Sequence, residues 1–146
     1  MSALARLAEL GIELPEVAPP VAAYIPAVRT GNLVYTSGQV ARDLTGKAGA
    51  EVSEADAKDA ARGCALNALA AVDALVGLDA VVRVVKVVGF VASAPGFTGQ
   101  PEVINGASEL LNEVFGEAGA HARSAVGVAE LPLGVPVEVE MIVEVR

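Results

Sequence analysis

Apolar and polar side chains alternate most regularly at the C-terminal end of the chain. From residue 135 to 145 every odd position is apolar, and glutamate occupies positions 138, 140 and 144. Because successive side chains of a β-strand point to opposite faces, this alternation predicts a half-buried strand. Residues 121–130 alternate less cleanly and predict another strand, joined to the first by a tight turn at 131–134. In such a hairpin Arg123 lies opposite about residue 143.

Three further segments have β-rich patterns. Two of them, at about residues 22–29 and 33–41, flank Thr30-Gly31-Asn32, where Gly and Asn tolerate the positive φ of a hairpin turn. The third, at 81–93, is apolar on both faces and is therefore expected to be covered on both sides. Its faces are Val81, Val85, Val87 and Val91 on one side, and Val82, Val84, Val88 and Phe90 on the other.

The first twenty residues predict a short helix and a proline-rich extension. Leucine recurs at helical spacing within residues 3–10, and prolines at positions 15, 19 and 20 then prevent the helix from continuing. We expect this helix to dock on a single domain that spans residues 1–146.

Two longer helices are expected in the body of the chain. One runs from Glu54 to about Leu78, with Ser53 as its N-terminal cap and Gly77 as a signal for its end. Its mainly alanine stripe permits close approach to a sheet. The other lies within residues 104–119, after a loop at 94–103, and ends at a glycine, either 116 or 119.

The resulting order is strand, strand, helix, strand, helix, strand, strand. It is typical of an α+β fold in which two helices pack on one face of a β-sheet. One helical layer covers only one face, so the doubly apolar strand at 81–93 needs a second layer. That layer is either another subunit or the interior of a barrel, and we favour a homo-oligomer.

The charge balance argues against several classes of partner. The 146 residues include 18 acidic and 10 basic side chains, a formal net charge of −8, without a cluster of lysine or arginine. The attraction that dominates affinity for nucleic acids is therefore missing, and an anionic membrane surface is disfavoured for the same reason. The N-terminal residues lack a signal-peptide pattern and no 18-residue stretch is free of charges or prolines, which favours a cytoplasmic protein.

Cysteine and histidine are too scarce for a structural zinc site. The single cysteine, Cys64, excludes an internal disulfide, and its place on the apolar stripe of the first long helix predicts an inert buried thiol. The single histidine, His121, has no companion acid or nucleophile at recognisable spacing and is interpreted as a loop residue. We expect no metal site.

Arg123 is the most informative candidate for function. It shares a strand face with the small residues Ala125 and Gly127, and a guanidinium in such a place needs a carboxylate or phosphate partner. A structural ion pair with Glu138, Glu140 or Glu144 and a bound ligand are equally compatible with the pattern. In the predicted hairpin Arg123 and Glu138 of one chain are roughly 16 Å apart, so they would meet more easily across a subunit interface.

Four other residues are weaker candidates, each with a structural explanation or next to a residue that has one. Gly38, after Ser37 in a strand, indicates either close approach by a ligand or backbone, or a bulge. Tyr24 offers one hydrogen-bond donor, although such a tyrosine is more typical of a core or interface. Asn105 is typical of a helix N-terminal cap.

Three segments together resemble the RidA (YjgF) family of enamine and imine deaminases. They are YIPAVRTGNLVYTSGQV, VINGASELLNEVFG and ARSAVGVAELPLGVPVEVEMIVEV, and the match runs from about Ala22 to the end of the chain. The resemblance implies a fold like that of trimeric chorismate mutase, a homotrimer with active sites in clefts between subunits. It also implies that Arg123 binds the substrate carboxylate, that Ser37 and the Gly38 backbone help to hold it, and that Tyr24 and Asn105 line the pocket. Glu138 matches the acidic residue of the family.

The implied reaction is hydrolysis of a 2-aminoacrylate-like enamine, or its imine tautomer, to a 2-keto acid and ammonia without a cofactor. Arg123 would orient the small carboxylate substrate, and Glu138 would position or deprotonate the attacking water. Two positions depart from the family, because its usual proline before the arginine and frequent cysteine after it are replaced by Ala122 and Ala125. The resemblance therefore indicates a divergent member.

Three alternatives remain open at this stage. The first is a trimer that binds a small carboxylate metabolite without catalysis. A chaperone-like or RNA-cleaving role fits poorly with an acidic chain. An isomerase resembling chorismate mutase would need a second cation for a dicarboxylate, for which the nearest candidate is Arg29.

Overall fold

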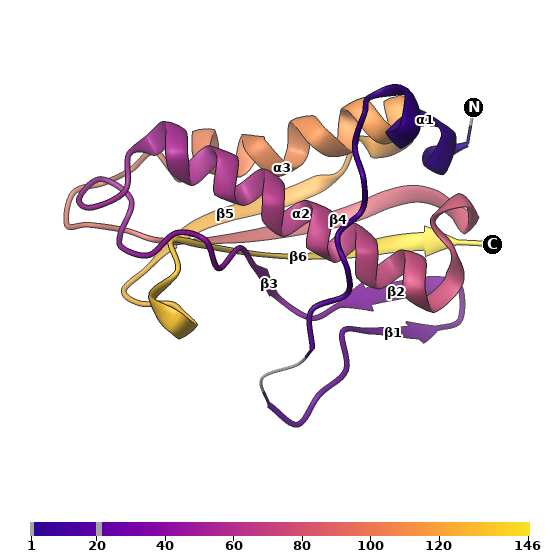
Figure 1. Ribbon diagram of the computed structural model, residues 1–146, viewed down its shortest axis with the longest axis horizontal. Helices are drawn as coiled ribbons and strands as arrows, with labels where there is room; N and C mark the ends of the chain where they lie inside the picture. Colours follow the sequence, from indigo (N-terminus) through magenta and orange to yellow (C-terminus); the bar gives the residue numbers. More distant parts are fainter. Residues whose placement is uncertain (1, 20–21) are drawn as a thin grey trace.

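The computed structural model describes residues 2–19 and 22–146, and it contains three α-helices and six strands within those residues (Figure 1). Pro20, the last residue of the predicted extension, and Met1 lie outside the described residues. The helices are α1 (Ala3–Glu9), α2 (Glu54–Val76) and α3 (Gln100–Phe115). The strands are β1 (Ala27–Thr30), β2 (Leu33–Thr36), β3 (Gln39–Val40), β4 (Val81–Ala92), β5 (Ala122–Val128) and β6 (Val137–Val145).

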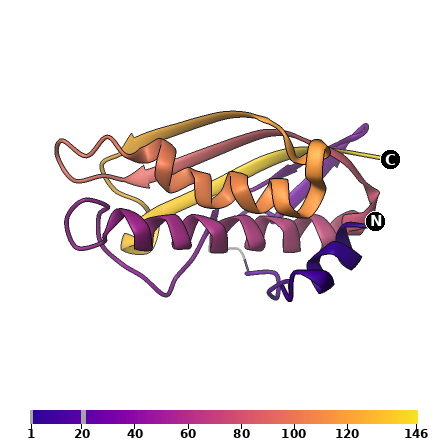
Figure 2. The same cartoon turned by 90° about the horizontal axis from the view of Figure 1, so that it is seen from above.

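The strands form one mixed sheet in the order β1-β2-β6-β4-β5, with β3 also paired to β6. The β4–β5 pair is parallel and the other pairs are antiparallel. Both long helices lie on the same side of this sheet (Figures 1 and 2), and they pack against each other as well as on the strands. The predicted α+β fold with two helices on one face is therefore confirmed.

The core lies between the sheet and these helices. Odd-numbered residues of β6 face it, so that Val139, Met141 and Val143 are buried and the intervening residues are only half-buried. The predicted alternation is confirmed, as is the alanine stripe of α2, most of which is fully buried. Close packing of this kind needs small side chains on the helix.

Local end signals are accurate for α2. The Ser53 hydroxyl accepts a hydrogen bond from the Asp56 amide at 3.1 Å, and Gly77 caps the C-terminus by donating to Asp73 O at 2.8 Å. The predicted N-terminal helix also forms. It docks on α3 through buried Leu7 and through Arg6, which donates to Glu113 O at 2.9 Å.

Three predicted segments have different bounds in the structure. The first strand begins at Ala27 because residues 22–26 form bends that end at a proline. The segment 33–41 is divided into β2 and β3, and the register on β6 moves by one residue between them, from Tyr35↔Ile142 to Gln39↔Val139. One extra residue on one strand is a β-bulge.

The third change concerns α3, which begins at Gln100 rather than within 104–119. Pro101 occupies its first turn, where the missing amide proton costs no intrahelical hydrogen bond. Asn105 consequently lies inside the helix, and its predicted role as an N-terminal cap is wrong. Gly116 ends the helix, which is one of the two predicted ends.

The hairpin predicted at the C-terminal end is wrong. β5 pairs with β4, in parallel, and β4 in turn pairs with β6, so that β4 lies between the two strands expected to be neighbours. Arg123 is aligned with Val87 rather than with residue 143. The segment 131–134 therefore connects strands that lie two positions apart in the sheet.

β4 is covered on one side only within the described chain. Irregularities between Val81 and Arg83 and between Val84 and Lys86 shift its register, so Val84 joins Val87 in the core and Val85 faces outward. The predicted two faces are therefore only partly correct. On the side away from the helices three valines remain between 36% and 45% exposed: Val82, Val85 and Val126.

None of the helices in the described residues combines the length and the apolar character that a membrane crossing requires.

Candidate functional site

Arg123 lies on β5, at the edge of the sheet. Its register partner on β4 is Val87, which is buried beneath the helices. Aligned residues of neighbouring strands point to the same face, so the Arg123 side chain extends toward the helical side, where it meets α3.

Three acceptors on α3 hold the guanidinium. Nη1 donates to Asn105 Oδ1 at 2.8 Å and to Ser108 Oγ at 3.2 Å, and Nη2 donates to Pro101 O at 3.3 Å. A guanidinium has five N–H donors. These three bonds leave two donors without an acceptor in the described residues, which is the number that one bidentate carboxylate accepts.

The acceptors of Arg123 are themselves held by a polar network. Asn105 donates to Glu102 at 3.2 Å, and Lys58 of α2 contacts Glu102 at 2.8 Å and also Glu109. The hydrogen bond from Lys58 lowers the pKa of Glu102, and the hydrogen bonds to both glutamates raise the pKa of Lys58. The network therefore fixes the orientation of the Asn105 amide.

His121 belongs to the same network. Its Nδ1 lies 2.6 Å from Gly119 O and its Nε2 lies 2.9 Å from Ser108 Oγ. Because a carbonyl only accepts, Nδ1 carries the proton, and in the neutral ring Nε2 accepts from the serine hydroxyl. The Ser108 oxygen is then oriented as the acceptor for Arg123. His121 is a loop residue, as predicted, but its connection to Arg123 was not foreseen.

No carboxylate forms an ion pair with Arg123 in residues 2–19 and 22–146. The predicted structural alternative, a pair with Glu138, Glu140 or Glu144, is therefore wrong for a single chain. These glutamates lie on the face of β6 opposite to the buried odd-numbered residues, away from the helices.

Glu138 is a carboxylate without a cationic partner in the described part of the chain. Burial is the main reason that its pKa is raised, and repulsion from Glu140 adds to the effect. A group of this kind retains basicity because its charged form is poorly solvated. It also lies against Gly38, where an added Cβ would come within 2.6 Å of Glu138 Oε2.

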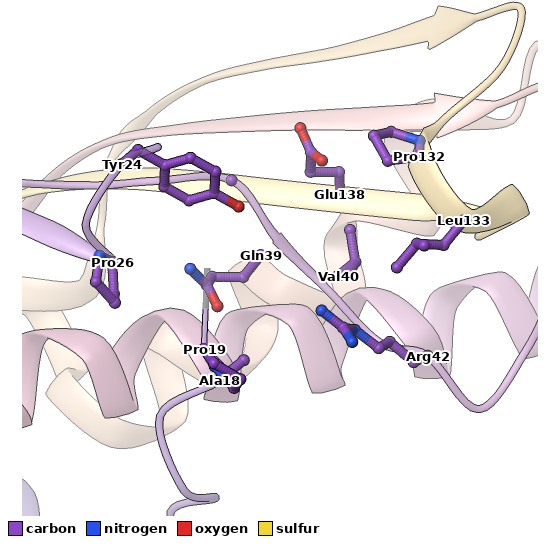
Figure 3. A pocket seen from close by; sticks show the side chains of 11 residues that line it. Ala18, Pro19, Tyr24, Pro26, Gln39, Val40, Arg42, Pro132, Leu133 and Glu138 are labelled. Atoms are coloured by element: carbon purple, nitrogen blue, oxygen red, sulfur yellow. The ribbon is translucent and has the colours of Figure 1, made fainter. Parts of the chain in front are cut away.

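A cavity of about 70 Å³ adjoins this carboxylate. Figure 3 shows Tyr24, Gln39, Arg42, Leu133 and Glu138 around it. Liquid water occupies roughly 30 Å³ per molecule, whereas pockets for drug-sized ligands measure roughly 300–1,000 Å³. The cavity of one chain therefore holds a small group only, unless a further surface completes it.

Ser37 and Gly38 have different structural roles beside this cavity. The Ser37 hydroxyl donates to Ile25 O at 2.6 Å and its amide donates to Pro26 O at 2.8 Å. These bonds hold the segment that carries Tyr24 against the end of β2. The bulge predicted at Gly38 is confirmed by the register shift, whereas the group that approaches it closely is the Glu138 side chain and neither a ligand nor backbone.

The predicted site residues thus form two groups. Arg123 and Asn105 lie together between β5 and α3, while Tyr24, Gly38 and Glu138 line the cavity, next to Ser37. The two groups are on opposite faces of the sheet. Along the register Glu138 is aligned with Phe90 and then Val126, so the backbones are also about 10 Å apart across the strands and about 10 Å apart along them.

Sequence reasoning missed Ser108 and Arg42. Ser108 lies seven residues after Pro101 on the same helix face as Asn105, and correct placement of the α3 start would have revealed this spacing. Arg42 had no signal, because the loop that carries it has no periodic pattern. Cys64 is fully buried as predicted, and burial raises the pKa of its thiol to about 12.

Two curated relatives cover nearly all of the chain. Protein TCP17 of Trypanosoma cruzi is 46% identical over 149 residues, which cover 97% of this chain and 93% of the relative. The 2-iminobutanoate/2-iminopropanoate deaminase of Dermatophagoides farinae is 33% identical over 135 residues, which cover 92% of this chain and 95% of the relative.

Solved structures support the same fold. Protein Atu1372 of Agrobacterium tumefaciens, of unknown function, is 45% identical with a TM-score of 0.89, covering 99% of this chain and 92% of its own. RidA from an Antarctic Psychrobacter is 30% identical with a TM-score of 0.63, covering 89% and 94%.

The family profile described as Endoribonuclease L-PSP matches residues 15–145, nearly the whole chain. Together with these relatives, the match shows that the chain belongs to the Endoribonuclease L-PSP family, which includes the RidA (YjgF) proteins.

Proposed function

We propose that the protein hydrolyses 2-imino acids, and the enamines in equilibrium with them, to 2-keto acids and ammonia. The observation that carries the proposal is the pair of complementary groups: a guanidinium with two N–H donors available, and an unpaired, partly buried carboxylate beside a small cavity. The name of the relative from Dermatophagoides farinae supports this reaction class.

Arg123 binds the substrate carboxylate in this mechanism. Its two available donors would form a bidentate pair, and Asn105, Ser108 and Pro101 O keep the guanidinium plane in place. A fixed carboxylate places the adjacent imine carbon at a defined position, which lowers the entropic part of the barrier.

Glu138 acts as general base in the proposed reaction. It accepts a proton from water as the water oxygen bonds to the iminium carbon, which gives a carbinolamine. Glu138 returns that proton to the amine nitrogen. The carboxylate then accepts the hydroxyl proton as the carbon–nitrogen bond breaks, so that the carbonyl forms and ammonia leaves. A carboxylate with a raised pKa is better suited to this proton transfer than an ordinary one.

The two groups belong to different subunits in the proposed assembly, a cytoplasmic homotrimer. Their positions on opposite faces of one sheet prevent them from meeting in one chain. The exposed valines Val82, Val85 and Val126 on the open sheet face supply apolar surface for contact between subunits. An active site between subunits would also enlarge the small cavity beside Glu138.

Cleavage of RNA is not proposed, despite the description of the family. The chain has a net charge of −8 and therefore does not favour binding of the negatively charged phosphates of RNA. A chorismate mutase-like reaction is not supported by Arg29 either, because this residue donates to Gly31 O and Arg146 O and lies away from the cavity.

The test is keto-acid formation from imines generated in situ by an amino-acid oxidase, measured above the uncatalysed rate. Arg123→Ala and Glu138→Gln are each expected to lower kcat/KM by roughly 100-fold or more. Arg29→Ala, outside both groups, is the matched control and should retain activity.

A wild-type rate equal to the buffer rate for every imine would overturn the deaminase proposal. If 2-oxobutanoate still bound and Arg123→Ala abolished that binding, the alternative of a non-catalytic carboxylate-binding trimer would be favoured.

A further inference from the structure

Arg42 lines the same cavity as Glu138. It follows β3 by two residues, and Figure 3 shows its side chain reaching toward Gln39 and Val40 while Glu138 approaches the cavity from β6. Of the described residues that line the cavity, Arg42 is the only cation and Glu138 the only anion. The mechanism above gives Arg42 no role.

Arg42 forms no ion pair within the described residues. The ion pairs of residues 2–19 and 22–146 involve Arg6, Lys47, Lys58 and Arg62 as the basic partners. Arg42 does not lower the pKa of Glu138 either, since burial and Glu140 account for the shift of that carboxyl group. Arg42, which is an exposed residue, therefore lines the cavity without a carboxylate partner in the described chain.

We propose that Arg42 binds a second carboxylate on the substrate, so that the protein prefers imines of amino dicarboxylic acids. This inference rests on the proposed function and specifies its substrate class. The α-carboxylate would bind Arg123 of one subunit, the imine would lie near Glu138 of the next, and the side-chain carboxylate would reach Arg42 in the same cavity.

The dimensions and chemistry of the cavity favour such a ligand. Its volume of about 70 Å³ is well below that of a pocket for a drug-sized ligand, roughly 300–1,000 Å³, and suits a small group such as a carboxylate with its adjacent methylene. Tyr24 and Gln39 add hydrogen-bonding groups, and Pro132 and Leu133 supply an apolar rim. A purely apolar side chain would desolvate the guanidinium without replacing the lost water contacts.

The negative charge of Glu138 opposes a bound anion in the same cavity. A cation is therefore required if the cavity is to accept a carboxylate. Arg42 is suited to this task because a guanidinium keeps its charge and pairs with a carboxylate through two parallel hydrogen bonds.

The first experiment measures binding rather than turnover. Isothermal titration compares 2-oxoglutarate with 2-oxopentanoate, which has the same carbon chain but lacks the second carboxylate. The wild-type protein should bind 2-oxoglutarate at least about tenfold more tightly. In Arg42→Met, which keeps a long side chain but removes the charge, the ratio of the two affinities should fall to about one.

Two further variants sharpen the comparison. Arg29→Met removes one positive charge elsewhere on the surface and should keep the preference for 2-oxoglutarate. Arg42→Lys keeps the charge but loses the two-pronged geometry and should give an intermediate ratio. Circular dichroism and gel filtration confirm that each variant is folded and assembled like the wild type.

Several outcomes overturn the inference. They are absence of 2-oxoglutarate binding, equal affinity for both keto acids, or an unchanged preference in Arg42→Met. A parallel rate assay with imines from glutamate and norvaline separates the two proposals. Hydrolysis without preference supports the deaminase and rejects the Arg42 role, whereas a dicarboxylate preference in binding without hydrolysis supports Arg42 and rejects the deaminase.

Discussion

The carboxylates of Glu138 and Glu144 belong to the same face of β6 but differ in their surroundings. Glu138 adjoins the cavity and the backbone at Gly38, and burial raises its pKa, whereas Glu144 lies in the part of the strand that pairs with β2 and the start of β4. The sequence shows both as the outward residues of an alternating strand. Only the arrangement of neighbouring segments makes one of them chemically distinct, because desolvation depends on distant parts of the chain.

The raised pKa of Glu138 makes the free energy of unfolding depend on pH. Because its folded pKa lies above the ordinary glutamate value of about 4.3, the native state binds more protons than the unfolded state between those two values. Stability is therefore lost as the pH rises through that window. Glu138→Gln should be more stable than wild type at pH 7, with a smaller difference below about pH 4.

Urea unfolding at pH 4 and pH 7 checks this prediction, with Glu144→Gln as the control on the same strand. A stability gain of equal size at both pH values would show that the carboxyl titration is not its cause.

At the scale of elements, α3 serves both the site and the core. The face with Pro101, Asn105 and Ser108, at a spacing of four and then three residues, holds Arg123. Gly106, next to Asn105, faces α2 instead, and an added Cβ there would overlap the backbone carbonyl oxygen of Lys58. The close contact of the two helices therefore depends on a glycine.

Gly106→Ala is expected to destabilise the protein. The overlap involves backbone, which no side-chain rotamer relieves, and overpacking costs about 1–3 kcal/mol, against a gain in helix propensity of about 1 kcal/mol. Thermal denaturation should show a lower Tm, by roughly 2–4 °C for each kcal/mol lost. Asn112→Ala, at an exposed position of the same helix, is the control. An unchanged Tm in Gly106→Ala would contradict this prediction, because the two helices could then move apart without a loss of stability.

At the scale of the whole molecule, the proposed reaction requires an assembly, because one chain keeps the two groups of site residues apart. Arg123 extends to the helical side of the sheet, while Glu138 lies on the opposite face and two strands away. The open face also leaves apolar residues of β4 and β5 exposed. A closed, symmetric oligomer would bury that face and could bring unlike groups of neighbouring chains together.

Mixed oligomers provide a direct test of this arrangement. Arg123→Ala and Glu138→Gln subunits, each inactive alone, are coexpressed with different affinity tags and purified as mixed trimers. If each site takes Arg123 from one subunit and Glu138 from the next, every purified mixed trimer contains one intact site, which is about one third of its sites. Imine hydrolysis should recover to about that fraction of wild-type activity.

Two outcomes would contradict the shared site. Mixed trimers that stay inactive would place both groups in one subunit or remove one of them from the mechanism, and a purified monomer with full activity would exclude the shared site altogether.

The sequence by itself determined most local features. Ser53 and Gly77 bound α2, the alternation of valine and glutamate defines β6, and the alanine stripe marks the buried side of α2. These features could be predicted because capping, helical periodicity and strand alternation depend on residues close in the chain. The family resemblance also identified Arg123 and Glu138 as candidates before any geometry was available.

The tertiary structure alone decided which of these residues meet. It placed β4 between β5 and β6, shifted the register at the β2–β3 bulge, and brought Ser108, His121 and Arg42 to the two groups of site residues. Strand order and bulges depend on pairing between segments far apart in the chain. A local sequence pattern does not indicate which segments pair. The separation of Arg123 from Glu138 by a whole sheet is therefore a property of the fold.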